Sequence, residues 1–297
     1  MVRVVIISII FFCNFACNFA VDSEVIDFKK ISPLNQEWEL YWNKLLEPDD
    51  FHDQNIIYNK KQNLPFFWNK IELNNQKLSS QGFLTLKKVV RIPESLIGRK
   101  LGIRVPEMFS AYKLFVNGNL KAANGTVSKI PEAYEPEWAP QTIYFTSLKN
   151  EIEFILQIAN FSYNLGGSWR NIEFGVAEKI NTKTNLLIFM DYFLFASVLT
   201  MGLYHIALFL KRRESFAALY FSLLCLIVSL RTMVSSEILI YNFFNPSWEF
   251  LIKLNLITVA LTPPCLSSSS NFYFTVVHIN LLQKQHRLSG CCTHLLL

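Results

Sequence analysis

Residues 110–118 read Ser-Ala-Tyr-Lys-Leu-Phe-Val-Asn-Gly, a strand pattern that ends in a turn signal. Apolar side chains alternate at Tyr112, Leu114 and Val116. This period of two indicates a strand with one buried and one exposed face. Asn117-Gly118 follows at once, and the pair favours a tight turn because both residues tolerate positive φ. The stretch therefore predicts an antiparallel hairpin.

The same alternation recurs on both sides of this hairpin. It marks residues 84–92 before Pro93, with a disturbance at Lys87-Lys88, then residues 101–105 before Pro106, and later residues 152–158. Several short strands separated by turn signals are typical of an antiparallel sandwich. Residues 38–46 fit either a strand or a helix from their pattern alone.

Composition divides the chain into unlike parts. Of its 297 residues 51% are hydrophobic, and only 17% are charged, where about a quarter is usual in a soluble domain. Residues 21–185 are nearly balanced, with 20 Lys and Arg against 19 Asp and Glu, and contain no cysteine. The net charge of +5 is too small to favour a nucleic-acid partner. We expect residues 21–185 to form one exported bacterial domain.

Two long apolar stretches follow this domain. Residues 186–210 and 216–234 are each long enough to cross a bilayer, which takes about 20 residues, and a third span is expected over residues 250–262. The basic turn Lys211-Arg212-Arg213 is cytoplasmic by the positive-inside rule. The chain is therefore predicted to lie in the lipid bilayer of a bacterial inner (cytoplasmic) membrane, with residues 21–185 in the periplasm or outside.

The two ends of the sequence carry separate expectations. Residues 1–20 have the pattern of a signal peptide, with cleavage after Ala20; lipidation at Cys17 and an uncleaved anchor helix are the alternatives. Residues 263–297 contain no Asp or Glu, and Pro263-Pro264 is expected to break the third span. This tail is typical of out-of-frame translation, and a genuine short third helix followed by a fourth is the alternative.

Several motifs together carry a resemblance to a known family. They are Glu-Trp-Glu-Leu-Tyr-Trp at 37–42, Pro-Phe-Phe-Trp at 65–68, the stretch 110–118, and Gly-Gly-Ser-Trp-Arg at 166–170. Their order resembles the outer domain of seven-transmembrane receptors with diverse intracellular signalling modules (7TMR-DISM). It is also similar to the galactose-binding-like jelly roll of sugar-binding modules in glycoside hydrolases. Residues 202–205, 219–221 and 230–231 resemble the first two helices of that receptor's membrane domain.

The resemblance implies a receptor with an all-β jelly-roll sensor outside the membrane and a helical bundle within it. In this family the outer domain senses a ligand, often thought to be carbohydrate-like, and a cytoplasmic module gives the output. This sequence has room for about three spans and no output module, so we expect a truncated receptor. The alternative is a membrane-tethered carbohydrate-binding accessory protein or glycoside-active enzyme. The paired spans favour the receptor, because a tether needs only one.

The sequence predicts binding rather than catalysis. It contains no GxGxxG, P-loop, HExxH, CxxC or GxSxG motif, and we expect no catalytic residue, cofactor or metal. Sugar sites combine an aromatic face with a few hydrogen-bonding groups. Candidate ligand-binding residues in apparent loops are Tyr134, Trp138, Tyr163, Trp169 and Arg170. Packing in the core or at its rim is the alternative for these five, whereas Trp38, Trp42, Trp68 and Tyr112 are expected in the core.

Overall fold

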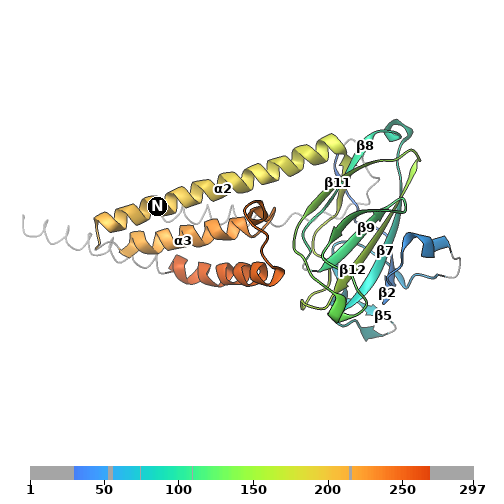
Figure 1. Cartoon of the computed structure of the whole chain (residues 1–297), viewed down its shortest axis with the longest axis horizontal. Helices are drawn as coiled ribbons and strands as arrows, with labels where there is room; N and C mark the ends of the chain where they lie inside the picture. Colours follow the sequence, from blue (N-terminus) through green and yellow to red (C-terminus); the bar gives the residue numbers. More distant parts are fainter. Residues whose placement is uncertain (1–29, 53–55, 74, 109, 214–215, 268–297) are drawn as a thin grey trace, which may run out of the picture.

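A computed structural model describes residues 30–52, 56–73, 75–108, 110–213 and 216–267 of the chain. It consists of a β-sandwich joined to three apolar helices, which extend from one end of the sandwich and lie side by side (Figure 1). The predicted signal peptide and the predicted tail from residue 268 onward lie outside the described residues. Both stay predictions.

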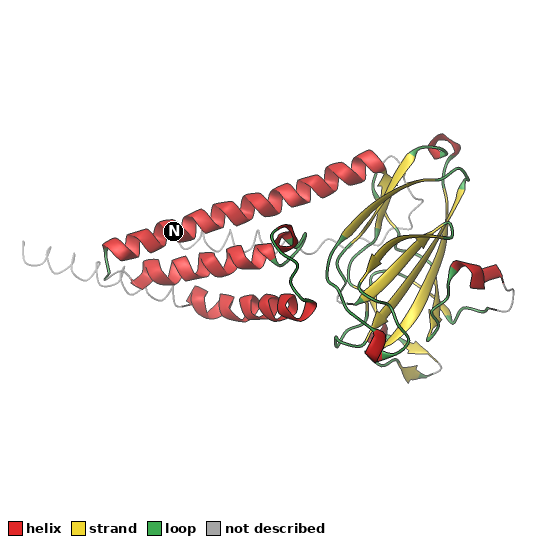
Figure 2. Ribbon diagram, viewed as in Figure 1, coloured by secondary structure: helices red, strands yellow, loops and turns green. Residues whose placement is uncertain are grey.

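Two antiparallel sheets make up the sandwich (Figure 2). The smaller sheet has the order β1 (Ser32–Pro33), β14 (Glu173–Val176), β8 (Lys100–Val105) and β11 (Gln141–Thr146). The larger has the order β10 (Asn119–Asn124), β9 (Ala111–Val116), β12 (Glu151–Asn160), β7 (Gly82–Arg91), β2 (Trp38–Trp42) and β3 (Lys60–Gln62). From β7 onward the chain passes repeatedly between the two sheets, which is the jelly-roll pattern. The predicted all-β jelly-roll sandwich is confirmed.

Short elements decorate the sandwich. Two small ribbons pair β4 (Phe66–Phe67) with β13 (Gly167–Ser168) and β5 (Glu72–Leu73) with β6 (Gln76–Lys77). The short 3-10 helices are η1 (Pro48–His52), η2 (Trp68–Lys70), η3 (Glu94–Leu96), η4 (Pro131–Ala133) and η5 (Leu239–Asn242).

The central hairpin forms as its sequence predicts. β9 and β10 are joined at Asn117 and Gly118, whose φ angles of 48° and 80° are both left-handed. The Asn117 side chain accepts a hydrogen bond of 2.9 Å from the Glu153 N–H, which ties the turn to β12. The undecided stretch 38–46 begins with strand β2, because Trp38 and Leu40 pack into the core with no exposed surface.

The core lies between the two sheets and is rich in aromatic rings. Phe154 of the larger sheet meets Phe174 of the smaller sheet edge-on at 5.6 Å, and Phe145 stacks on Phe174 at 6.2 Å. Trp38, Trp68 and Tyr112 are fully buried, as expected. Trp42, in contrast, is only half-buried, because it lies at the end of β2.

The three helices are α2 (Ala177–Lys211), α3 (Phe216–Met233) and the helix Trp248–Ser267. Each is long and apolar enough to cross a membrane, so the predicted spans are confirmed as apolar helices. The third helix continues through Pro263 and Pro264 to Ser267, five residues beyond the predicted end. The predicted break of the third span at Pro263-Pro264 was wrong, because the fixed φ of proline is compatible with a helix although its backbone donor is lost. Arg231 of α3 donates to Asn255 of the third helix at 2.8 Å.

Candidate functional site

The five loop residues predicted to bind ligand pack into different parts of the sandwich. Tyr134 is 7% exposed and meets Phe161 edge-on at 5.4 Å in a small buried cluster. Trp138 is 3% exposed and packs among residues that follow α3. Tyr163 packs against that second cluster, and its ring centre lies 5.6 Å from that of Trp169.

Arg170, the fifth of these residues, is exposed and pairs with Glu107 at 3.2 Å. None of the five residues lines either of the two clefts described next. Direct ligand contact by these residues therefore stays a prediction, and their packing gives them a structural role in addition.

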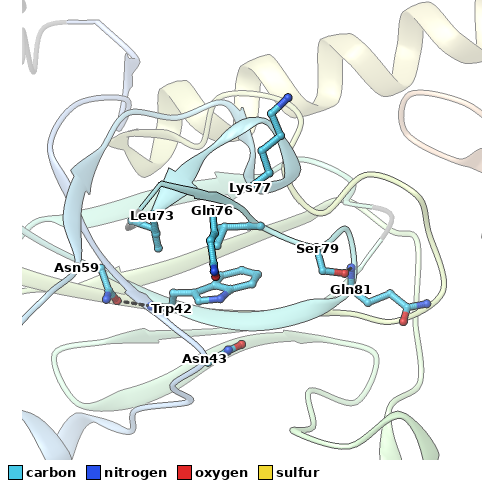
Figure 3. Close-up of a pocket in the computed structure, with 9 residues that line it drawn as sticks. Trp42, Asn43, Asn59, Leu73, Gln76, Lys77, Ser79 and Gln81 are labelled. Atoms are coloured by element: carbon cyan, nitrogen blue, oxygen red, sulfur yellow. Dashed lines mark hydrogen bonds between the residues drawn. The ribbon is translucent and has the colours of Figure 1, made fainter.

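One cleft opens beside Trp42, where the β5–β6 ribbon lies over the end of β2; we call it the Trp42 cleft. Its volume is about 410 Å³. In Figure 3 the Trp42 indole forms its floor, the Gln76 side chain points toward that ring, and Lys77 points away from it. The remaining lining residues are Asn43, Asn59, Leu73, Leu78, Ser79 and Gln81. An aromatic face surrounded by amides and a hydroxyl is suited to a polar, neutral ligand.

The ring of Trp42 is held from two sides. It meets Trp68 edge-on at 5.5 Å, and the Trp68 Nε1–H donates to the Ser80 carbonyl at 3.0 Å. The Trp42 backbone N–H donates to Asn59 Oδ1 at 2.7 Å. Gly82 leaves room for the indole, since a Cβ there would lie 2.9 Å from Trp42 Cη2. The floor of the cleft is therefore preformed.

The lining of this cleft has no carboxylate among its nine residues. Glycoside hydrolysis ordinarily needs two carboxyl groups across the scissile bond. The Trp42 cleft is therefore equipped to bind a ligand and lacks the usual acid and base for cleaving a glycosidic bond. Over the residues that the structure describes, no group of three or more His, Cys, Asp or Glu is placed to hold a metal ion.

A second cleft, of about 430 Å³, lies where the sandwich meets the segment between α3 and the third helix. Its lining from the sandwich is Gly125, Glu135, Pro136 and Glu137, and its lining from the other side is Tyr241, Asn245, Pro246 and Trp248. The Glu137 carboxylate accepts a hydrogen bond of 2.8 Å from the Gly125 N–H, so one of its oxygens is already bonded within the sandwich.

Buried charges lie at the same junction. Arg104 of β8 donates to Glu237, which follows α3, and their side chains are only 7% and 6% exposed. The Glu237 N–H in turn donates to Asp191 Oδ2 of α2 at 3.1 Å. Burial raises the pKa of Glu237 and that of Glu107, and the positive charges of Arg104 and Arg170 oppose both shifts.

Sequence reasoning did not find the Trp42 cleft or the buried charge pair. Trp42 shares the inward parity of Trp38 and Leu40, which favoured a core position. Arg104 and Glu237 are 133 residues apart and belong to no local motif. A usable signal was the set of amide side chains around Trp42: Asn43, Asn59 and Gln81 stand next to strands β2, β3 and β7, and Gln76 lies in β6.

Comparison with known proteins adds two findings, and no curated protein matches the chain. Solved structures similar to the sandwich include a β-glucuronidase from an uncultured Clostridium (14% identity, TM-score 0.36, covering 53% of this chain and 30% of that one). A second is a putative β-galactosidase from Bacteroides fragilis (15% identity, TM-score 0.35, covering 49% of this chain and 23% of that one). A third is a β-glucuronidase from Ruminococcus gnavus in complex with uronic deoxynojirimycin (10% identity, TM-score 0.39, covering 50% of this chain and 29% of that one).

The chain spans less than a third of the length of these enzymes. At such identities and TM-scores the similarity supports no conclusion about activity or substrate.

The second finding concerns the helices. The matching family model is described as 7TM diverse intracellular signalling, and its range includes part of the predicted aberrant tail. That family is one of receptors, and with three apolar helices the chain is a membrane protein. Residues 187–296 thus match the 7TM region of the 7TMR-DISM family, the family that the sequence motifs resemble.

Proposed function

We propose that the chain is the sensing and first membrane-spanning part of a bacterial signalling receptor, and that its sandwich binds a small sugar-like ligand in the Trp42 cleft. One observation carries the signalling role. Strand β14 ends at Val176 and helix α2 begins at Ala177, so no linker separates the sandwich from the membrane helix. A flexible tether would leave the two parts independent, whereas a continuous strand and helix move together.

The first turns of α2 are also fastened to the smaller sheet. Ile180 has no exposed surface and packs on Gly102, where a Cβ would lie 3.0 Å from the Ile180 Cβ. Lys183 pairs with Glu173 at 2.6 Å, and Tyr144 donates to Asn181 at 3.2 Å. These contacts support a rigid joint, so a displacement of the sheet would displace the helix with it.

The orientation that we propose puts the sandwich outside the cytoplasm, in the periplasm of a bacterium with an inner membrane. The segment between α3 and the third helix contacts the sandwich and carries no Lys or Arg from residue 235 to 248. The basic turn Lys211-Arg212-Arg213 joins the other ends of α2 and α3. The positive-inside rule supports a cytoplasmic position for that turn.

Ligand binding can be tested on the full chain in lipid nanodiscs. Neutral mono- and oligosaccharides are screened by thermal shift, and hits are measured by calorimetry for the wild type, Gln76→Ala and Trp42→Ala. Both variants should lose affinity about tenfold or more, because stacking and amide contacts fix a sugar. Asn119→Ala is the matched control, an exposed amide at the far edge of the same sheet, and should bind as the wild type does.

Three results would overturn the proposal. The first is no saccharide binding at all. The second is binding that survives both cleft variants and is abolished by Trp169→Ala. The third is release of sugar from a glycoside by the full chain, which would favour the alternative of a membrane-tethered glycoside-active protein.

A further inference from the structure

The turn of residues 235–238, between α3 and the third helix, has an unusual backbone; we call it the coupling turn. Ser236 and Ile238 both have left-handed φ angles, of 60° and 50°. A β-branched residue in this region is a genuine outlier and persists only where surrounding contacts hold it. This backbone presents Glu237 to the sandwich.

We propose that the coupling turn holds the sandwich in a fixed orientation on the membrane helices, with the Arg104–Glu237 pair as the contact that both parts must keep or break together. The inference rests on the proposed receptor function for its meaning in signalling. The contact itself can be tested without any ligand.

Three elements meet at this turn. Glu237 accepts a hydrogen bond from Arg104 of β8 through its side chain and donates one to Asp191 of α2 through its backbone, at 3.1 Å. Ile238 is 1% exposed and packs in one cluster with Trp138 of the sandwich and Leu251 of the third helix. Two neighbouring residues of the turn, Glu237 and Ile238, thus contact the sheet, the first helix and the third helix.

The buried charge pair is better suited to fix an orientation than to add stability. Removing two charges from water offsets most of their attraction, but separating a buried pair leaves an uncompensated charge and is strongly unfavourable. Glu107 and Arg170 form a second pair beside the first, and Glu107 is also buried. Partial displacement of the sandwich is therefore unfavourable, and the joint should occupy discrete arrangements.

Packed aromatic rings and the loop 160–170 connect the Trp42 cleft to the coupling turn. Trp42 contacts Trp68, and Gly166 lies directly against the Trp68 ring. Trp169 contacts Tyr163, which packs against the cluster that contains Ile238. The loop 160–170 therefore joins the supporting ring of the cleft to the junction, and this path places Tyr163 and Trp169 between the two.

Hydrogen–deuterium exchange with mass spectrometry, on the full chain in nanodiscs without ligand, tests the contact. Arg104→Met and Glu237→Gln should each raise exchange in peptides covering residues 235–240 about tenfold or more, because each breaks the pair that holds the turn. Exchange in the double variant should be about equal to exchange in either single variant, since the two substitutions remove the same interaction. Amides of β7 and β12 should exchange as in the wild type.

Arg91→Met is the matched control, since Arg91 pairs with Glu151 on the surface with 84% of its side chain exposed. This variant should leave exchange in residues 235–240 unchanged. Unchanged exchange in Glu237→Gln, which keeps the size of the side chain, would overturn the inference, and so would an equal rise in Arg91→Met. Absence of saccharide binding would refute the proposed ligand but would not alter this readout.

Discussion

Gly166→Ala tests whether the Trp42 cleft depends on the packing beneath it. An added Cβ at residue 166 would lie 2.0 Å from Cε2 and Cζ2 of Trp68 and 2.6 Å from its Nε1. Carbon atoms in contact need about 3.5–4.0 Å, so the fully buried indole must move by roughly 1.5 Å. Overpacking costs about 1–3 kcal/mol, and the strained Trp68–Ser80 hydrogen bond adds about 1 kcal/mol.

We therefore expect Gly166→Ala to lower the free energy of unfolding by about 2–4 kcal/mol. Tryptophan fluorescence during urea unfolding of the full chain in nanodiscs measures this change. Gly118→Ala is the matched control, because its φ is 80° but nothing lies within 4 Å of the added Cβ. Gly118→Ala should lower the free energy of unfolding by only about 1–2 kcal/mol, which is the cost of placing a residue with a Cβ in a left-handed backbone conformation.

Gly166→Ala should also lower the affinity of the Trp42 cleft for its ligand, because Trp68 supports the Trp42 ring. A cost of less than about 2 kcal/mol for Gly166→Ala would refute the steric reasoning. Unchanged ligand affinity in a destabilised Gly166→Ala protein would show that Trp42 does not depend on Trp68.

Three further changes probe the junction and its loop. Burial raises the pKa of Glu107 above 4.5, so this carboxyl contributes stability that is full below its unfolded pKa and is lost as the pH rises through the raised value. The stability of Glu107→Gln relative to the wild type should therefore increase as the pH rises above about 4.5 in a thermal series, and a relative stability that is constant or falls over this range would contradict this. Asn160→Ala removes three hydrogen bonds of a fully buried amide, including two with the Tyr163 backbone, and should cost about 2–4 kcal/mol in denaturant unfolding. Trp138→Ala should cost about 3–5 kcal/mol and raise proteolysis between α3 and the third helix, whereas a cost confined to the sandwich would argue against the shared cluster.

Local features of the fold are encoded in short stretches of the sequence, whereas contacts between distant segments are not. Alternation at Tyr112, Leu114 and Val116 and the Asn117-Gly118 turn are encoded within nine residues, and the structure reproduces them. Apolar length alone likewise identified the membrane helices. The start of α2 at Ala177 was not evident, because its first turns are polar and become helical where they pack on the sheet.

By itself the sequence determined the class of the protein: strands with one buried face, helices that need a bilayer, and motifs whose order resembles one receptor family. Only the tertiary structure decided where binding and coupling take place. Trp42 lines a cleft because the β5–β6 ribbon lies over the end of its strand, and Arg104 meets Glu237 across 133 residues of chain. Periodicity records which face of an element is buried, but it carries no information on which distant segment covers that face, since sheet order and helix docking set that partner.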